Sequence, residues 1–279
     1  MSELKIRSAA NMPWETIETQ RTKVRKVGSW KWGAHRGAFM EGWAENSIPA
    51  LIRAKERGFG YSECDVKLTA DNQIVICHNP TITGTLNGVS TTLTIAESTA
   101  EEVCALTWGP HLRSGYYHPC TLDELLETAY FVDIGVIIHG GHTEEMGKMI
   151  AKSVLAHGMQ GKVIYMPSLE AAAGIVSVDH RAAIEFCLVT ATVPEDLTEY
   201  AAFLPQCDYV GFDLQANWTN TAEDIERLRE NGFGVSFWNV NGSNYAACLD
   251  VKPRAMSLAA DTDDFHAWEQ TYLESVKLW

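Results

Sequence analysis

A regular alternation of short apolar runs with amphipathic segments is the feature that most constrains the fold of this chain, and it begins after residue 28. The apolar runs have the length of β-strands, and most of the segments between them repeat apolar residues with helical periodicity. A strand followed by a helix, many times over, predicts parallel strands joined by right-handed crossovers.

The expected strands cover Trp30–His35, Tyr61–Val66, Ile74–His78, Gly135–His139, Lys162–Met166, Ala183–Val189, Tyr209–Asp213, Gly234–Val240 and Ala255–Ala259. The expected helices cover Ser47–Arg57, Leu122–Tyr130, Glu144–His157, Glu195–Phe203, Ala222–Glu230, Asn244–Leu249 and Asp263–Val276.

Nine expected strands are one too many for an eight-stranded barrel, and one short connection accounts for the extra strand. Lys67–Gln73 is too short for a crossover helix and holds the turn residues Asp71 and Asn72, which predicts an antiparallel pair between the second and third strands. The remaining eight strands are then expected to close a (β/α)₈ TIM barrel. The alternative is an open doubly wound sheet, which would need a glycine-rich loop after the first strand, and His35-Arg36-Gly37 is not one.

Residues 79–120 interrupt the alternation, with few helical patterns and many Thr, Gly and Pro residues. A connection of this length within a compact domain is usually a functional lid or an insertion. We therefore expect an N-terminal extension over residues 1–28 and one barrel domain over residues 29–279, with an insertion at about 79–120. Thr121, followed by Glu124, predicts a capping box where the helical pattern resumes.

Charge and hydropathy limit the classes of partner and the location that we expect for this chain. The chain has 279 residues, with 22 Lys and Arg against 36 Asp and Glu, a formal net charge of −14. This argues against nucleic acid and anionic membranes as partners, since both require a basic face. No run has the roughly 18 to 20 apolar residues of a transmembrane helix, and residues 1–28 lack the apolar core of a signal peptide. The seven cysteines show no tight spacing, and with these features they favour reduced thiols in a cytoplasmic protein.

Catalytic groups of a parallel barrel lie at the carboxyl ends of its strands. In this chain those positions hold His35, Arg36, Glu63, Asp65, His78, His139, Asp213, Trp238, Asn239 and Asp261. Ionisable residues are concentrated there, which predicts a chemical site at this end of the barrel.

Glu63 and Asp65 form an i, i+2 pair, so both side chains point to the same face of their strand. Two carboxylates on the inner face of a barrel repel each other strongly unless a cation lies between them or one holds a proton. A divalent ion such as Mg²⁺ or Ca²⁺, which prefers oxygen ligands, would resolve this. The alternative is a solvated edge strand with both carboxylates facing outward.

His35 and His78 each end an apolar run and are expected at the same rim as Glu63. An imidazole transfers protons near neutral pH, so two of them beside one substrate can act in turn as base and acid. Each could instead be an ordinary rim histidine. Trp238 is the best candidate among the aromatic residues for a wall of a substrate pocket.

Four runs carry a family resemblance: Gly33-Ala34-His35-Arg36-Gly37, Glu45-Asn46-Ser47, Glu63-Cys64-Asp65-Val66-Lys67-Leu68-Thr69-Ala70-Asp71 and Val75-Ile76-Cys77-His78-Asn79-Pro80. In order and spacing they resemble the glycerophosphodiester phosphodiesterase family, whose pattern is His-Arg-Gly, Glu-Asn-Thr, Glu-x-Asp-Val-x-x-Thr-x-Asp-Gly and Val-x-His-Asp. Weaker likenesses at 119–126, 237–241 and 256–262 extend the resemblance to about residues 30–265.

The resemblance implies a (β/α)₈ enzyme that uses a divalent metal to cleave glycerophosphodiesters to glycerol 3-phosphate and an alcohol. His35 and His78 would be the acid–base pair, and Glu63 and Asp65 two metal ligands. Arg36 would bind phosphate, and its planar fork suits two phosphate oxygens at once. Glu45 matches a supporting carboxylate at the rim of the substrate site. In this family the nucleophile can be the substrate's own glycerol hydroxyl, which gives a cyclic phosphate before water opens it.

One departure from the family pattern concerns the metal. The family carries Glu-x-Lys where this chain has His139 and Gly141, and it has Asp where this chain has Asn79. His139 could remain a ligand, which would favour Mn²⁺ or Zn²⁺ over Ca²⁺ because imidazole suits transition metals. Three interpretations stay open: an active glycerophosphodiester phosphodiesterase, a related lipid phosphodiesterase of the sphingomyelinase D kind, and a catalytically silent protein that binds a phosphodiester polymer or lipid head group.

Overall fold

The computed structural model describes residues 31–39, 42–111, 115–188, 192–216, 221–241, 243–244, 247–248 and 255–258. The expected N-terminal extension over 1–28, the helix expected over Asp263–Val276 and Asp261 lie outside these residues. The domain limits therefore stay a prediction.

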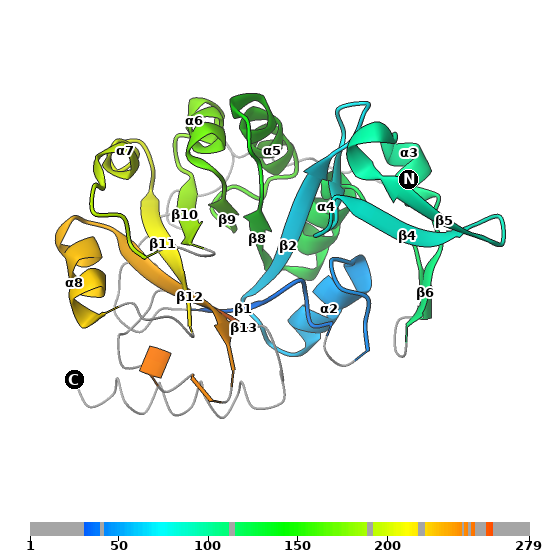
Figure 1. Cartoon of the computed structure of the whole chain (residues 1–279), viewed down its shortest axis with the longest axis horizontal. Helices are drawn as coiled ribbons and strands as arrows, with labels where there is room; N and C mark the ends of the chain where they lie inside the picture. Colours follow the sequence, from blue (N-terminus) through cyan, green and yellow to red (C-terminus); the bar gives the residue numbers. More distant parts are fainter. Residues whose placement is uncertain are drawn as a thin grey trace.

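Parallel strands close into a ring. Following the ring, they are β1 (Lys31–Ala34), β13 (Ala255–Leu258), β12 (Gly234–Val240), β11 (Tyr209–Gln215), β10 (Ala183–Leu188), β9 (Val163–Met166), β8 (Gly135–His139) and β2 (Tyr61–Leu68). The ring closes because β1 pairs in parallel with both β13 and β2. The TIM-barrel prediction is confirmed, and the open-sheet alternative is wrong (Figure 1).

The extra strand is β3 (Ile74–Ile76), which pairs antiparallel with β2 in the register Val66↔Ile76. Asn72 has a φ of 58° in the turn between them. The Thr69 hydroxyl there accepts a hydrogen bond from the Gln73 backbone N–H. The short connection between the two strands thus forms the antiparallel pair that its turn residues predict.

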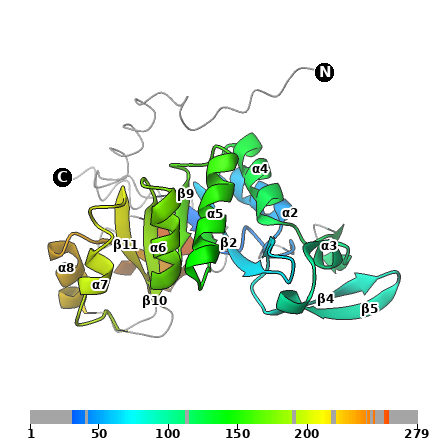
Figure 2. The same ribbon diagram turned by 90° about the horizontal axis from the view of Figure 1, so that it is seen from above.

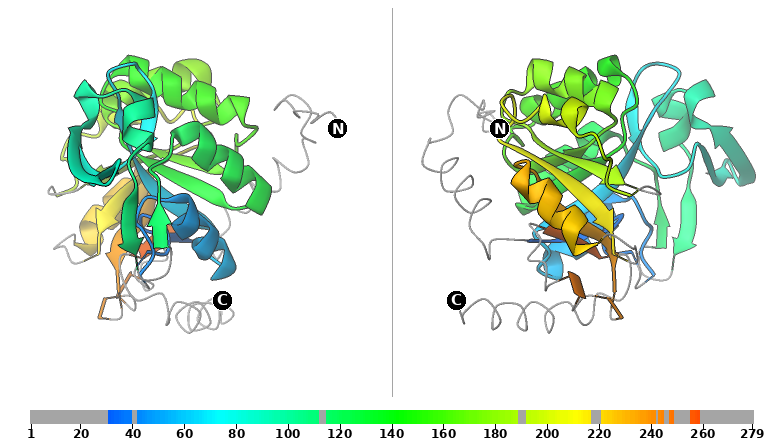
Figure 3. Two further views of the ribbon diagram at one scale, coloured as in Figure 1. Left: turned by 90° about the vertical axis from the view of Figure 1, so that its right-hand side faces the viewer. Right: turned by 60° about the vertical axis from the view of Figure 1, so that its left-hand side comes forward.

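Helices cover the outside of the strands (Figure 3). They are α2 (Ile48–Glu56), α4 (Leu122–Val132), α5 (Glu144–Ala156), α6 (Leu169–Val178), α7 (Thr198–Ala201) and α8 (Ala222–Glu230). Thr121 and Glu124 form the expected capping box of α4. Helix α6 is not among the helices expected from the sequence, and α7 is shorter than the expected Glu195–Phe203. Of the helix expected over Asn244–Leu249, only residues 247–248 are described as helical.

The segment at 79–120 is ordered secondary structure beside the barrel. It contains the hairpin β4 (Thr81–Leu86) and β5 (Val89–Thr94), the short helices η2 (Ile95–Glu97) and α3 (Ala100–Cys104), and the pair β6 (Trp108–His111) and β7 (Gly115–Tyr117). A small core that includes Val75, Ile82, Ile95, Val103 and Leu106 joins the segment to the barrel. The β4–β5 hairpin projects away from the barrel (Figure 2).

Side chains divide between the two faces of the strands. Residues such as Val136, Ile138 and Phe212 belong to the large core cluster that also contains helix residues, while Tyr61, Ile137, Ile164 and Met166 form a separate cluster. In strands, alternate residues point to opposite faces, so the second cluster lies inside the barrel. Glu63, Asp65 and His139 lie on this same inner face. No helix of the described residues is long and apolar enough to cross a bilayer.

Candidate functional site

The turn after β1 is the first element of the site. Arg36 has a φ of 53° and Gly37 a φ of 75°, both in the left-handed region. A Cβ at position 37 would lie 2.7 Å from the Ala50 Cβ of α2, so glycine is required for this close approach. The tight turn aims the Arg36 backbone N–H at β2, where it donates to Glu63 Oε2 over 2.6 Å.

The two carboxylates of β2 point into the barrel. Glu63 is 3% exposed and Asp65 is 4% exposed, while Cys64 between them belongs to the outer core cluster. This is the alternation that the sequence predicts, and the alternative of two outward, solvated carboxylates is wrong. Arg36 also reaches Asp65, with its Nε 3.5 Å from Asp65 Oδ2.

Asn46 fixes the position of Asp65. Its Nδ2 donates to Asp65 Oδ2 over 2.9 Å, and its Oδ1 accepts from the Asp65 backbone N–H over 2.9 Å. Asn46 is buried and has a φ of 52°. Sequence reasoning gave it no role, although its place just before the N-cap Ser47 of α2 and the tolerance of asparagine for the left-handed region were available signals.

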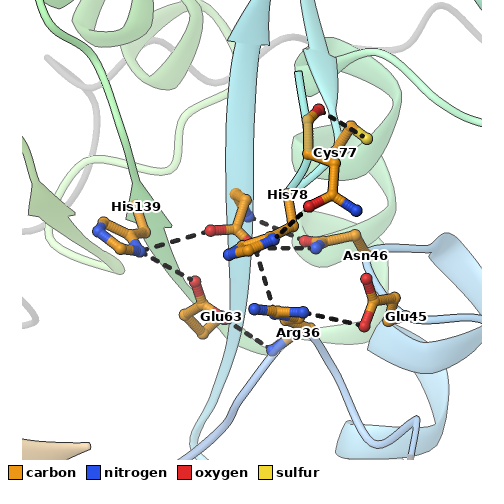
Figure 4. A network of polar contacts seen from close by, with 9 residues as sticks. Arg36, Glu45, Asn46, Glu63, Cys77, His78 and His139 are labelled. Atoms are coloured by element: carbon orange, nitrogen blue, oxygen red, sulfur yellow. Dashed lines mark hydrogen bonds and ion pairs between the residues drawn. The ribbon is translucent and has the colours of Figure 1, made fainter. Parts of the chain in front are cut away.

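His139 completes a group of three possible metal ligands. It lies opposite Asp65 in the register of β2 and β8, with its Nδ1 3.4 Å from Asp65 Oδ1 and 3.9 Å from Glu63 Oε1. Figure 4 shows the imidazole turned toward Glu63 from the neighbouring strand. One ligand atom from each of Glu63, Asp65 and His139 lies within 4.8 Å of the others.

Burial and mutual repulsion set the charges of this group. Burial, and then the Asp65 carboxylate, raise the pKa of Glu63 to about 8. Burial acts in the same direction on Asp65, but hydrogen bonds from His139 and Asn46 outweigh it and lower the Asp65 pKa to about 2. Burial works against a charged His139, yet the Asp65 hydrogen bond and the Glu63 charge raise its pKa. At neutral pH the metal-free Glu63 therefore holds a proton that a bound cation would displace.

The other candidate residues surround the same pocket, which is open to solvent and has an empty volume of about 600 Å³. It is lined by His35, Arg36, Glu63, Asp65, His78, His139, Met166, Cys187, Asp213 and Trp238. Of these, Asp213 was noted only as a strand-end residue, and Met166 and Cys187 were missed because each looks like an ordinary core residue. Glu45 does not line the pocket but accepts a hydrogen bond from Arg36 Nη1 over 3.1 Å, while Gly141 and His142 are not among the lining residues.

The two further histidines differ in environment. Burial, and then the Arg36 charge, lower the pKa of His35 to about 4, so His35 is neutral at pH 7. His78 is exposed at the pocket, and its Nδ1 lies 3.1 Å from Asn79 Oδ1 (Figure 4). One imidazole thus lies deep in the pocket and the other lies at its open side.

The residues present fit a divalent cation. Glu63 Oε1 is buried and has no hydrogen-bond partner among the described residues. A buried carboxylate oxygen without a partner is costly, and a second carboxylate and an imidazole nitrogen lie close enough to share an ion with it. Two oxygens and one nitrogen are a donor set that Mg²⁺, Mn²⁺ and Zn²⁺ all accept.

A closed parallel barrel with carboxylates and imidazoles at the carboxyl ends of its strands has the architecture of a barrel enzyme. The model of the glycerophosphoryl diester phosphodiesterase family matches residues 35–256. The chain therefore belongs to this family, and the prediction of a phosphodiesterase is confirmed.

Individual relatives agree with this assignment. The Bacillus subtilis protein YhdW, provisionally named a glycerophosphodiester phosphodiesterase, is 27% identical over 228 residues, which are 78% of this chain and 89% of YhdW. The glycerophosphodiester phosphodiesterase of Agrobacterium tumefaciens has a similar structure, with a TM-score of 0.66 at 20% identity, covering 85% of this chain and 99% of that one. An Oleispira antarctica phosphodiesterase solved with the product sn-glycerol-3-phosphate gives a TM-score of 0.68 at 16% identity, covering 88% and 96%.

Proposed function

We propose that this chain hydrolyses small glycerophosphodiesters to glycerol 3-phosphate and an alcohol in the pocket at the carboxyl ends of its strands. The observation that carries the proposal is the convergence of Glu63, Asp65, His139, His35 and Arg36 on one pocket. Family membership supports the reaction class, and the related Oleispira antarctica phosphodiesterase holds sn-glycerol-3-phosphate.

Glu63, Asp65 and His139 would hold the divalent metal ion. When bound, the ion neutralises negative charge on the non-bridging phosphate oxygens. His139 brings a nitrogen donor to a position where the family pattern has a carboxylate. We therefore expect this chain to accept Mn²⁺ or Zn²⁺ as well as Mg²⁺, and to accept Ca²⁺ less readily.

Arg36 would bind the phosphate. Glu45 holds Nη1 of its guanidinium, and Asp65 lies beside its Nε. These two acidic partners restrain the side chain at the pocket wall, so less conformational freedom is lost when a phosphate binds. Glu45 would then act on the substrate through Arg36 rather than by touching it.

The two histidines would transfer the protons. Neutral His35 accepts the proton of a glycerol hydroxyl while that oxygen forms a bond to phosphorus and the bond to the alcohol breaks. His78, at the open side, donates a proton to the departing alcohol oxygen. Water then opens the cyclic phosphate with the two roles reversed. Each positioned proton transfer typically contributes on the order of 10² to 10⁴ in rate.

The experiment is the release of glycerol 3-phosphate from glycerophosphocholine, measured with Mg²⁺, Ca²⁺, Mn²⁺ or Zn²⁺ added in turn to metal-depleted protein. We expect metal-dependent turnover that falls at least about 100-fold in His35→Ala. The matched control is His157→Ala, which removes an imidazole that contacts the Ser153 carbonyl at the end of α5, away from the pocket. Turnover that survives His35→Ala would reject the two-histidine mechanism, and no turnover with any ion would favour a silent binding protein.

A further inference from the structure

The wall of the pocket opposite the metal-ligand group carries a second polar pair. In the ring of strands β11 lies directly across from β2. Asp213, on β11, is 2% exposed and lines the pocket. Its neighbours in the sheet register are Cys187 on β10 and Ser236 on β12. The proposed mechanism gives this buried carboxyl group no role.

Asp213 has an unused hydrogen-bonding atom. Its Oδ1 is buried and has no hydrogen-bond partner in the part of the chain that the structure describes. The neighbouring Ser236 hydroxyl does not serve it, because Ser236 Oγ donates to Glu185 Oε1 over 2.6 Å. Buried carboxyl oxygens normally have a partner, so a group from outside the protein is the natural candidate.

Trp238 supplies the complementary group. Its indole Nε1 is also buried without a hydrogen-bond partner among the described residues, and the side chain lines the same pocket. In register, Asp213 lies opposite Ser236 and Gln215 opposite Trp238, so Asp213 and Trp238 are diagonal neighbours on the inner face of β11 and β12. A hydrogen-bond acceptor and a fixed donor thus stand side by side.

We infer that Asp213 and Trp238 form the subsite that binds the glycerol hydroxyls of the substrate, across the pocket from the phosphate. This rests on the proposed function and specifies which half of the diester the wall recognises. A hydroxyl both donates and accepts, so it can satisfy the carboxyl and the indole N–H together. The departing alcohol would then lie toward the open side, near His78.

A cationic head group such as choline is the competing occupant, since a carboxylate and an aromatic ring are common partners of quaternary ammonium. Two observations favour the glycerol. A quaternary ammonium group has no acceptor for the Trp238 N–H. Burial and the Glu185 and Glu63 carboxylates also raise the pKa of Asp213 well above its usual value, which weakens its attraction for a cation.

The test measures binding of glycerol 3-phosphate and of inorganic phosphate to the full chain saturated with Mn²⁺, by titration calorimetry. We expect Asp213→Ala and Trp238→Phe each to weaken glycerol 3-phosphate binding about 10-fold, with the affinity for inorganic phosphate changed less than about twofold. Asp213→Asn keeps an acceptor oxygen and should lose less than Asp213→Ala. The matched control is Val235→Ala, which opens the outer core beside the same strand pair without touching the pocket.

Three results would overturn the inference. Equal losses for both ligands would mean that the pair supports the phosphate site or the fold. A raised KM for glycerophosphocholine with unchanged glycerol 3-phosphate binding would place the head group at this wall. Wild-type affinity for both ligands in Asp213→Ala and Trp238→Phe would mean that neither residue contributes to binding glycerol 3-phosphate. Failure of the proposed function is a separate result, because it would appear as wild-type protein that does not turn over glycerophosphocholine.

Discussion

At the scale of single residues, position 139 is where the proposed metal ligands Glu63, Asp65 and His139 depart from the family pattern. A carboxylate there would add a negative charge and a hard oxygen donor beside Asp65, whose Oδ1 lies 3.4 Å from the present imidazole. We therefore predict that His139→Glu shifts the metal preference toward Mg²⁺ or Ca²⁺ and away from Zn²⁺. Turnover of glycerophosphocholine with each of the four ions would measure the shift.

The control for this substitution is His142→Glu, which adds the same charge three residues further on, outside the pocket lining. It should leave the order of the four ions unchanged. If His139→Glu and wild type have the same order of ions, His139 does not contact the metal.

Protonation of the same group predicts how metal binding depends on pH. Glu63, with its pKa raised to about 8, holds a proton at neutral pH in the metal-free protein, and the raised pKa of His139 makes its imidazole harder to deprotonate. A metal ion must displace the Glu63 proton, so its affinity should increase as the pH rises from 6 toward about 8. Calorimetry in buffers of different ionisation enthalpy should detect proton release at pH 7. Affinity that is constant over this range, without proton release, would contradict the raised pKa values.

Sequence reasoning located the site residues that follow from strand alternation and missed those that depend on contacts across the fold. Glu63 and Asp65 could be placed on one face because side chains alternate along a strand. Asn46 could not be assigned to Asp65, because its contact joins residues 19 positions apart through the entry to α2. The unused oxygen of Asp213 depends on where the Ser236 hydroxyl points, which no local pattern specifies.

Close contact between α5 and α6 is the most demanding packing feature at the scale of elements. The two helices lie side by side in Figures 1 and 2. A Cβ at Gly174 would overlap the Glu144 carbonyl, and one at Gly147 would overlap the Ala171 carbonyl. We predict that Gly174→Ala lowers the free energy of unfolding by about 1–3 kcal/mol, because the backbones must separate to admit the methyl group.

Urea unfolding monitored by circular dichroism would measure this change. The matched control is Ala173→Val, which enlarges the exposed neighbour on the same helix and should change stability by less than about 0.5 kcal/mol. Equal stability of Gly174→Ala and wild type would mean that the two helices can move apart without cost.

The same helix shows where the sequence was least informative about the fold. Residues 169–178 read Leu-Glu-Ala-Ala-Ala-Gly-Ile-Val-Ser-Val, with a single charged residue and therefore no clear polar face. Periodicity detects a helix by the contrast between its faces, so α6 was not recognised. The strands β4 to β7 were missed for another reason, since they pair locally and many of their residues are exposed, which leaves little apolar alternation to detect.

At the scale of the whole molecule, the net negative charge and the buried carboxylates determine how much a bound metal ion would stabilise the fold. The chain carries a formal charge of −14 and buries Glu63, Asp65, Glu185 and Asp213 inside or beside one barrel. Neutralising part of this charge favours the folded state, and an ion that binds only the native site stabilises it by mass action. The proposed ligands come from the adjacent strands β2 and β8, and the turn after β1 donates a hydrogen bond to Glu63. A bound ion would therefore stabilise the part of the ring where β1 pairs with β2.

We therefore predict that removing metal with EDTA lowers the melting temperature of the whole barrel. At free ion about 100 times the dissociation constant, binding contributes about 2.7 kcal/mol, which corresponds to roughly 5–10 °C for a domain of this size. The shift should disappear in the double variant Glu63→Gln, Asp65→Asn and persist in Glu45→Gln, which changes a carboxylate that contacts Arg36 outside the ligand group. Differential scanning calorimetry with and without added Mn²⁺ measures it. The prediction would be contradicted if calorimetry shows the ion bound to wild type while the melting temperature stays unchanged. The ion would then bind the folded and the unfolded chain equally well, and residues 63, 65 and 139 would not form its site in the folded barrel.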